Sequence, residues 1–263
     1  MSNKRHEVKP FPPMRRATTG ILEAASRKHM IHAILEVDVS EPRDLIRQYQ
    51  VMNGETLSFT SYLIHCLANA VDVNKHMHAY RDWRNRLILF DDVDVSTPIE
   101  RDAGDKKQVI PFILRSANMK PLLELHREIR QAQSSEPERT GVFPLMRIFL
   151  IIPTFISGLF FRIMDRFPHV MKNNGGTVML TNVGLFGEGG GWGIPIATHT
   201  LNVTVGGIIN RPIVTSRGLE EREHLCLTVS FDHDIIDGAP AARFLQRFKE
   251  IIEGGESLKQ LAS

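Results

Sequence analysis

Apolar residues stand at every second position in some segments of this chain and recur with helical spacing in others, and this change of period constrains the fold most. Residues 31–39 alternate in this way, as in a strand with one buried face. Residues 87–95 and three closely spaced runs, 177–181, 201–205 and 225–231, also have extended patterns. Segments of both kinds along one chain indicate a mixed α and β fold.

Helices are expected between these strands. We expect two of them to begin at the caps Ser40 and Asn118, and an amphipathic one to run from Ser58. A last helix over residues 239–253 is expected to end at a Gly-Gly pair. No internal repeat and no Pro/Ser-rich linker divides the chain. We therefore predict one domain over residues 13–263, preceded by a weakly ordered N-terminal arm of residues 1–12.

The charge and cysteine content exclude some classes of protein. The chain has 32 Lys and Arg and 30 Asp and Glu, a formal net charge of +2, which gives no sign of nucleic-acid binding. Cys66 and Cys226 each lie in an apolar pattern, so we expect reduced core residues and no disulfide. The polar residues 1–10 lack the apolar stretch of a secretory signal, and we predict a cytoplasmic protein.

Residues 148–161 form a stretch of fourteen residues without a charge. A membrane-spanning helix needs about 20 apolar residues, so this stretch is too short to be one. Pro153 and Gly158 also interrupt it. Two interpretations stay open: a buried helical hairpin or oligomer contact, and an interfacial membrane element over residues 145–167 with Arg147, Arg162 and Arg166 at headgroup level.

A polar turn between the last strand-like run and the last helix holds His233, in the sequence His-Asp-Ile-Ile-Asp-Gly. The end of a strand is a place where a rigid scaffold can hold a reactive side chain. An unperturbed histidine has a pKa of about 6.5 and is a base at pH 7. A thiol has a pKa of about 8.5 and benefits from such a base, so His233 is a candidate for thiol activation.

Attack of a thiol on a thioester creates an oxyanion, which needs a hydrogen-bond donor. Thr181 and Asn182 stand at the end of a strand-like run, before a glycine-rich turn near the expected acyl site. Either side chain has a suitable donor. The glycine-rich residues 187–193 lack the Gly-Lys-Ser/Thr ending of a phosphate loop.

Metal binding is not predicted. Two close histidine pairs occur, but no cysteine or carboxylate set completes a site at a known spacing; the pairs are His29 with His32 and His76 with His78.

Residues 230–245, Ser-Phe-Asp-His-Asp-Ile-Ile-Asp-Gly-Ala-Pro-Ala-Ala-Arg-Phe-Leu, resemble the signature of the catalytic domain of 2-oxoacid dehydrogenase dihydrolipoyl acyltransferases. Chloramphenicol acetyltransferase shares the His-x-x-x-Asp-Gly motif. The likeness runs along nearly the whole chain, in order, through Met14-Arg15-Arg16, residues 35–39, 59–71, 93–98 and 109–111, and Leu180-Thr-Asn-Val-Gly-Leu-Phe-Gly.

The resemblance implies an α/β (α+β) fold like that of chloramphenicol acetyltransferase, with a mixed sheet packed by helices. It also implies a homotrimer, or a larger homo-oligomer, with each active site at a subunit interface. Coenzyme A, as acyl-CoA, enters such a site from one side and a second thiol, typically dihydrolipoyl, from the other. No metal takes part.

The resemblance also assigns roles to residues of the two motifs. His233 matches the general base, and Thr181, from the neighbouring subunit, matches the hydroxyl that stabilises the tetrahedral intermediate, with Asn182 beside it. Asp237 matches an aspartate that orients the loop through an arginine, for which Arg15 and Arg16 are both candidates. Gly238 is expected to let the turn close onto the helix.

Three departures from the family pattern leave the acceptor open. We expect a stand-alone domain that meets a lipoyl group on a separate protein, because no lipoyl or subunit-binding module is recognisable before residue 13. Asp234 stands where a basic residue commonly follows the histidine. Residues 142–171 look like an apolar insertion.

Three functions are consistent with these features. The first is an acyltransferase that moves an acyl group between CoA and a thiol, with dehydrogenase subunits as further partners. The second is a non-catalytic trimeric scaffold or assembly protein of a dehydrogenase-like complex. The third is a membrane-surface acyltransferase that uses residues 145–167 to approach another acceptor.

Overall fold

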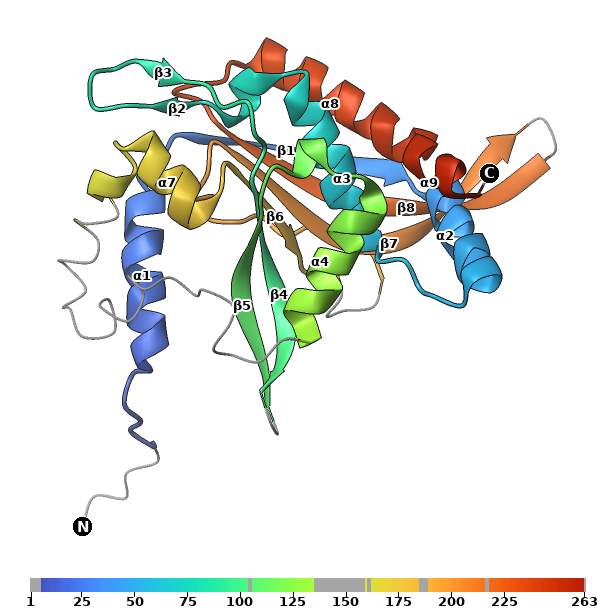
Figure 1. Cartoon of the computed structure of the whole chain (residues 1–263), viewed down its shortest axis with the longest axis horizontal. Coiled ribbons are helices and arrows are strands. Elements are labelled where there is room, and N and C mark those ends of the chain that lie inside the picture. Colours follow the sequence, from blue (N-terminus) through green and yellow to red (C-terminus); the bar gives the residue numbers. More distant parts are fainter. Residues whose placement is uncertain are drawn as a thin grey trace.

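A mixed six-stranded sheet forms the centre of the protein in the computed structural model, which describes residues 6–103, 106–134, 159, 162–184, 189–215 and 218–262 (Figure 1). The strand order is β1-β8-β7-β6-β4-β5. The pairs β4–β6 and β6–β7 are parallel, and the other neighbours are antiparallel. The strands are β1 (Met30–Asp38), β4 (Val95–Ala103), β5 (Lys106–Leu114), β6 (Val178–Asn182), β7 (Leu201–Thr215) and β8 (Gly218–Asp232).

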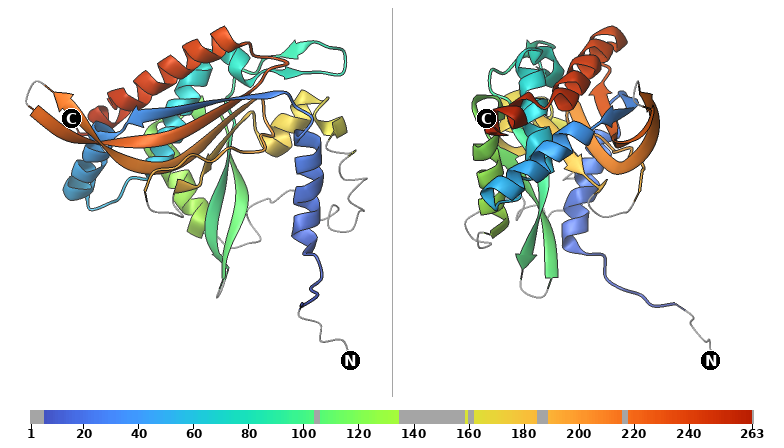
Figure 2. Two further views of the ribbon diagram at one scale, coloured as in Figure 1. Left: turned by 180° about the vertical axis from the view of Figure 1, so that it is seen from behind. Right: turned by 90° about the vertical axis from the view of Figure 1, so that its right-hand side faces the viewer.

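Helices cover one face of this sheet (Figure 2). They are α2 (Ser40–Asn53), α3 (Phe59–Asp72), α4 (Leu122–Ser134), α8 (Gly238–Gly254) and α9 (Glu256–Ala262). Ser58 caps α3 by accepting a hydrogen bond from the Ser61 N–H at 3.4 Å. Gly255 ends α8 in the left-handed conformation at φ 64°, as expected. The prediction of a mixed sheet packed by helices is confirmed.

Two of the predicted caps are wrong. Ser40 is the first residue of α2, and its hydroxyl instead accepts a hydrogen bond from the Glu223 N–H at 2.8 Å. Asn118 lies in the 3-10 helix η2 (Ala117–Met119), where its side-chain oxygen accepts a hydrogen bond from the Val93 N–H. The helix α4 begins only after Pro121, a residue suited to a first turn because it has no N–H to satisfy.

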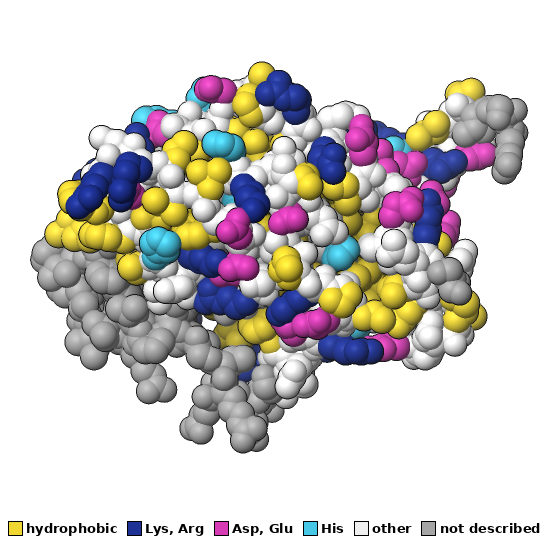
Figure 3. Space-filling view, turned by 45° about the horizontal axis from the view of Figure 1, so that its top comes forward, with side chains coloured by type: hydrophobic (Ala, Val, Ile, Leu, Met, Phe, Trp, Pro, Cys, Tyr) yellow, Lys and Arg dark blue, Asp and Glu magenta, His cyan; other side chains and the backbone are white. Residues whose placement is uncertain are grey.

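The predicted strand over residues 87–95 is largely wrong. Leu87–Ile88 (β3) pairs with Tyr80–Arg81 (β2) in a separate two-stranded hairpin, and of the remaining residues only Val95, which begins β4, lies in a strand. The predicted runs 201–205 and 225–231 are confirmed, but each belongs to a strand of 15 residues. Beyond the sheet these two strands continue as an arm that projects from the body of the molecule (Figure 3).

Four elements lie at the opposite end of the sheet from this arm (Figures 1 and 2). They are α1 (Pro13–Ala25), η1 (Lys75–His78), the β2–β3 hairpin and α7 (Pro168–Gly175). Residues 6–12 have no helix or strand. No helix among the described residues is long and apolar enough to cross a membrane. Of the predicted insertion, residues 142–171, the structure describes only residues 159 and 162–171.

Candidate functional site

The turn that carries His233 is held by backbone hydrogen bonds on both sides. Asp232, the last residue of β8, donates its N–H to the Thr200 carbonyl at 2.9 Å and accepts from the Ile236 N–H at 2.9 Å. The His233 N–H donates to the His29 carbonyl at 2.8 Å. The main chain of His233 is thus fixed between β8 and the segment before β1, while its side chain is exposed.

Ion pairs next to the turn also stabilise it. Asp232 is 4% exposed, and its carboxylate binds Lys28 at 3.3 Å and accepts from the Asp234 N–H at 3.1 Å. Lys28 also binds Asp165, at 3.0 Å, in the described segment just before α7. Buried carboxylates need such partners because desolvation penalises an unpaired charge. One lysine therefore joins the residue before His233 to the segment before α7.

Asp234, on the other side of His233, is bound from two directions. His29 Nδ1 lies 2.9 Å from one of its carboxylate oxygens, and an Arg81 nitrogen lies 3.6 Å from the other. The hydrogen bond with His29, with the nearby charges of His29, Arg81 and Lys28, lowers the pKa of Asp234 despite some desolvation. Both neighbours of His233 in sequence are therefore anchored.

The other predicted residues of this turn are placed at the start of α8. Asp237 is exposed and precedes the first helical residue, but its side chain makes no capping hydrogen bond. In the single chain a Cβ added at Gly238 would meet no atom within 4 Å, so its expected role in the turn stays a prediction. No ion pair links Asp237 to Arg15, which is exposed on α1; the side chain of Arg16 lies outside the described part, so this pairing stays a prediction.

Thr181 is half-buried near the end of β6, far from His233 of the same chain. It is paired in register with Thr204 of β7, which is paired with Thr228 of β8. His233 lies five residues beyond Thr228. With roughly 3.3 Å per residue and 4.8 Å between strands, the two lie about 17 Å apart along the strands and about 10 Å across them. One chain therefore does not bring both side chains to one thioester.

The strand end that carries Thr181 is held by backbone packing. Asn182 donates its amide N–H to Thr60 Oγ1 at 2.9 Å. Beyond it, Gly189 and Gly191 approach the bulge of β7 so closely that a Cβ at Gly206 or Gly207 would lie 2.0 or 1.9 Å from their carbonyl oxygens. The glycine-rich sequence is thus required for close approach of two backbones.

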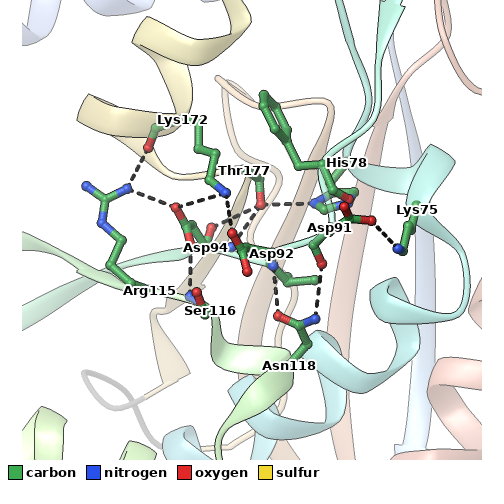
Figure 4. A network of polar contacts seen from close by, with 12 residues as sticks. Lys75, His78, Asp91, Asp92, Asp94, Arg115, Ser116, Asn118, Lys172 and Thr177 are labelled. Atoms are coloured by element: carbon green, nitrogen blue, oxygen red, sulfur yellow. Dashed lines mark hydrogen bonds and ion pairs between the residues drawn. The ribbon is translucent and has the colours of Figure 1, made fainter.

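A second polar cluster surrounds Asp94, at the start of β4 (Figure 4). Arg115 binds the Asp94 carboxylate at 2.9 Å and donates to the Lys172 carbonyl at 2.8 Å, which fixes α7 to the sheet. The buried His78 has Nδ1 3.1 Å from Thr177 Oγ1 and Nε2 3.0 Å from the Phe90 carbonyl. Burial lowers the pKa of His78 to about 4, so this ring is neutral at pH 7.

The described residues form neither a disulfide nor a cluster of metal ligands. Within the ranges that the structure describes, no group of three or more His, Cys, Asp or Glu could hold a metal ion. Cys66 and Cys226 are free and buried, as predicted, and burial raises the pKa of Cys66 to about 12.

The sequence of the chain matches that of a known protein family. A family model for the catalytic domain of 2-oxoacid dehydrogenases acyltransferase matches residues 3–140 and 168–260. The chain belongs to this acyltransferase family. The match skips residues 141–167, where the sequence predicts an insertion.

Relatives and solved structures agree with the family. The chain is 24% identical over 249 residues to the dihydrolipoyllysine-residue succinyltransferase component of the 2-oxoglutarate dehydrogenase complex of Staphylococcus epidermidis, covering 92% of this chain and 51% of that protein. It thus spans about half the length of that curated relative.

The fold matches those of solved acyltransferases. The dihydrolipoamide acetyltransferase of Azotobacter vinelandii superposes with a TM-score of 0.70 at 17% identity, covering 97% of this chain and 96% of that one. The cubic core of a pyruvate dehydrogenase multienzyme complex gives 0.70 at 16% identity and the same coverage. Chloramphenicol acetyltransferase gives 0.52 at 14% identity, covering 94% and 99%. The expected family and its acyltransferase fold are confirmed.

The sequence did not identify the residues that hold the turn. Lys28, His29 and Arg81 belong to segments without a motif, and only the fold brings them to Asp232 and Asp234. The one available signal was Asp234 itself, an acid in a place where the family commonly has a base. An acid at this position predicts that a basic side chain lies nearby, but it does not identify that side chain as His29 or Arg81.

Proposed function

We propose that this acyltransferase-family protein moves an acyl group between CoA and a thiol such as dihydrolipoyl, with His233 as the general base. The exposed imidazole on a rigid turn is the observation that carries the proposal. A base in this position needs both a fixed main chain and access to the thiol. The His233 turn meets both needs.

The spacing of the motif residues supports the assignment of roles. The Azotobacter vinelandii study concerns a serine, a histidine and an asparagine, of which the serine lies 52 residues before the histidine and the asparagine four after it. Thr181, His233 and Asp237 have the same two separations. This agreement supports our assignment of Thr181 to the hydroxyl position and of Asp237 to the position of the asparagine.

In the proposed reaction, a ring nitrogen of His233 takes the proton of the acceptor thiol. The thiolate attacks the carbonyl carbon of the acyl-CoA, and the Thr181 hydroxyl donates a hydrogen bond to the oxyanion that forms. The bond to the CoA sulfur then breaks, and the imidazolium returns the proton to that sulfur. Asp237 takes no proton and helps to orient the turn.

Thr181 acts from a neighbouring subunit of a homotrimer in this proposal. The support is the distance between Thr181 and His233 in one chain, together with the similarity to an oligomeric core. A heterologous interface of a closed trimer puts one surface of a subunit against a different surface of the next. Three equivalent sites result.

Mixed oligomers test this arrangement. His233→Ala and Thr181→Ala chains, co-expressed with different tags and purified through both, contain interfaces with an intact His233 and an intact Thr181. We expect thiol release from acetyl-CoA, with dihydrolipoamide present, well above that of either variant alone. Mixed oligomers that are no more active than the single variants would place both residues in one subunit.

Loss of the base itself is the primary test of activity. His233→Ala is expected to lower kcat about 10²- to 10⁴-fold, the usual contribution of a positioned general base. The assay is the same thiol release, with succinyl-CoA and acetyl-CoA as donors. Equal rates for wild type and variant would remove His233 from the mechanism and favour the non-catalytic scaffold.

We also propose partners and a cellular location for the protein. A separate lipoyl protein and dehydrogenase subunits are the partners that the relative's name suggests. The two reduced, buried cysteines support a cytoplasmic location. A membrane-surface role rests on the predicted segment 145–167, of which the structure describes Leu159, Arg162 and residues 163–167.

A further inference from the structure

A pocket of about 530 Å³ lies directly beside the His233 turn. Its walls come from the end of α1, the start of the β2–β3 hairpin and the described residues 162–167, and Asp232, Asp234 and Ile235 contribute from the turn. His233 itself is not in the lining. Residues 162–167 lie in the region that the family model skips, so this wall is a feature of this chain.

In the pocket lining, every aspartate has an ion-pair partner, but several arginines have none among the described residues. All three aspartates have a partner: Lys28 binds Asp165 and Asp232, and Arg81 binds Asp234. Three arginines of the lining make no ion pair with a described residue, and these are Arg27, Arg162 and Arg166. A guanidinium group without a carboxylate partner is suited to an anionic ligand, which it can bind through paired N–H donors.

The rest of the lining is apolar, and part of it is exposed. Ile163 is 50% exposed and Phe167 44%. Leu159 is exposed to a similar extent, and Ile21 and Met171 complete this wall. Large apolar side chains around a cavity of this size are typical of sites for small ligands. The pocket thus presents an apolar wall next to three cationic groups.

We propose that this pocket binds an anionic amphiphile, a ligand with one apolar chain that ends in a carboxylate or phosphate. The chain lies against Ile163 and Phe167, and the anionic end pairs with Arg162 and Arg166. A free fatty anion and an anionic lipid in a membrane share this chemistry. The proposal does not depend on the proposed function, because binding can be measured without turnover.

Calorimetric titration of the full chain with dodecanoate and with dodecyl phosphate, both below micelle formation, tests the site. Saturable binding is expected. The double variant Arg162→Gln/Arg166→Gln should bind at least tenfold more weakly, and so should Ile163→Asp. The matched control, Arg127→Gln/Arg130→Gln, removes the same charge from exposed positions of α4 and should bind like wild type.

Two further measurements separate the sources and the alternatives. Co-sedimentation with phosphatidylglycerol vesicles, against phosphatidylcholine vesicles, identifies a membrane lipid as the source if the wild type binds the anionic vesicles and the double variant does not. Binding of dodecanol as strong as that of dodecanoate would overturn the role of the arginines. No binding in any arm, or unchanged binding by the double variant, would overturn the site.

Acyl transfer is measured in parallel and distinguishes the two proposals. The double variant retains its acyl-transfer rate if the pocket is separate from the chemistry. A protein that binds dodecanoate but releases no CoA would contradict the proposed function and leave the pocket intact.

Discussion

His233 and His78 both lie among aspartates, but the protein holds them in different ways. At His233 the main chain and the two neighbouring aspartates are fixed, while the ring is exposed. At His78 both ring nitrogens have partners and the ring is buried. The first arrangement leaves the imidazole accessible to a ligand, and the second encloses it and lowers its pKa. The surroundings therefore distinguish two histidines that both lie near aspartates.

The cations of the two clusters also differ. In the cluster next to His233, Lys28 forms ion pairs with both Asp165 and Asp232. Around His78, the Asp94 carboxylate has Arg115 at 2.9 Å and Lys172 at 3.9 Å. Among the described residues, Lys28 is the one cation that pairs with the Asp232 carboxylate, so this ion pair should be more easily broken than that of Asp94.

The largest expected effect on stability follows from removing that residue. Lys28→Met leaves Asp232 buried without its cation, and breaking a buried pair in this way costs about 3–5 kcal/mol of unfolding free energy. Urea unfolding measures it. The matched control is Lys75→Met, whose partner Asp91 is 92% exposed and whose loss should change the midpoint little. Equal effects of the two variants would contradict the comparison.

The sequence predicted the architecture better than it predicted the residues that hold the His233 turn in place. The period-two run of β1, the helical spacing of apolar residues after Ser58 and the His-x-x-x-Asp-Gly motif are local signals, because each depends only on residues close together in the sequence. Lys28 and Asp232 are 204 residues apart in sequence, so no pattern along the chain could join them. The same reason explains why the predicted cap at Asn118 is wrong. Its side-chain amide binds Val93 and Asp72, which are distant in sequence, and does not cap the helix that follows it.

Acid should destabilise the protein through its buried histidines. Burial lowers the pKa of His78 and of His199 to about 4, whereas an unfolded histidine has a pKa of about 6.5. Between these values the unfolded chain binds protons that the folded chain does not, so stability falls as the pH drops from about 6.5 to about 4. Each residue accounts for about 3 kcal/mol over that window.

Unfolding free energies at pH 7, 6 and 5 measure this slope. His78→Gln should make it shallower, because one of the buried histidines with a lowered pKa is removed. His76→Gln is the control, since His76 is exposed and two residues away. A slope that is unchanged in His78→Gln would mean that His78 binds protons equally well in the folded and unfolded chains.

The smallest effect is expected at Arg81, because Asp234 has a second and closer partner. His29 Nδ1 lies 2.9 Å from the Asp234 carboxylate, whereas the nearest Arg81 nitrogen lies 3.6 Å from it. The side chains of His29 and Arg81 are 78% and 40% exposed. Arg81→Gln should therefore lower kcat/KM no more than about fivefold, since such an ion pair contributes at most about 1 kcal/mol. Arg84→Gln is the control: Arg84 lies in the same hairpin, but it stacks on Trp83 at 4.5 Å. A loss in Arg81→Gln as large as that in His233→Ala would show that Arg81 touches the substrate, and that the His233 turn is held less firmly than its contacts indicate.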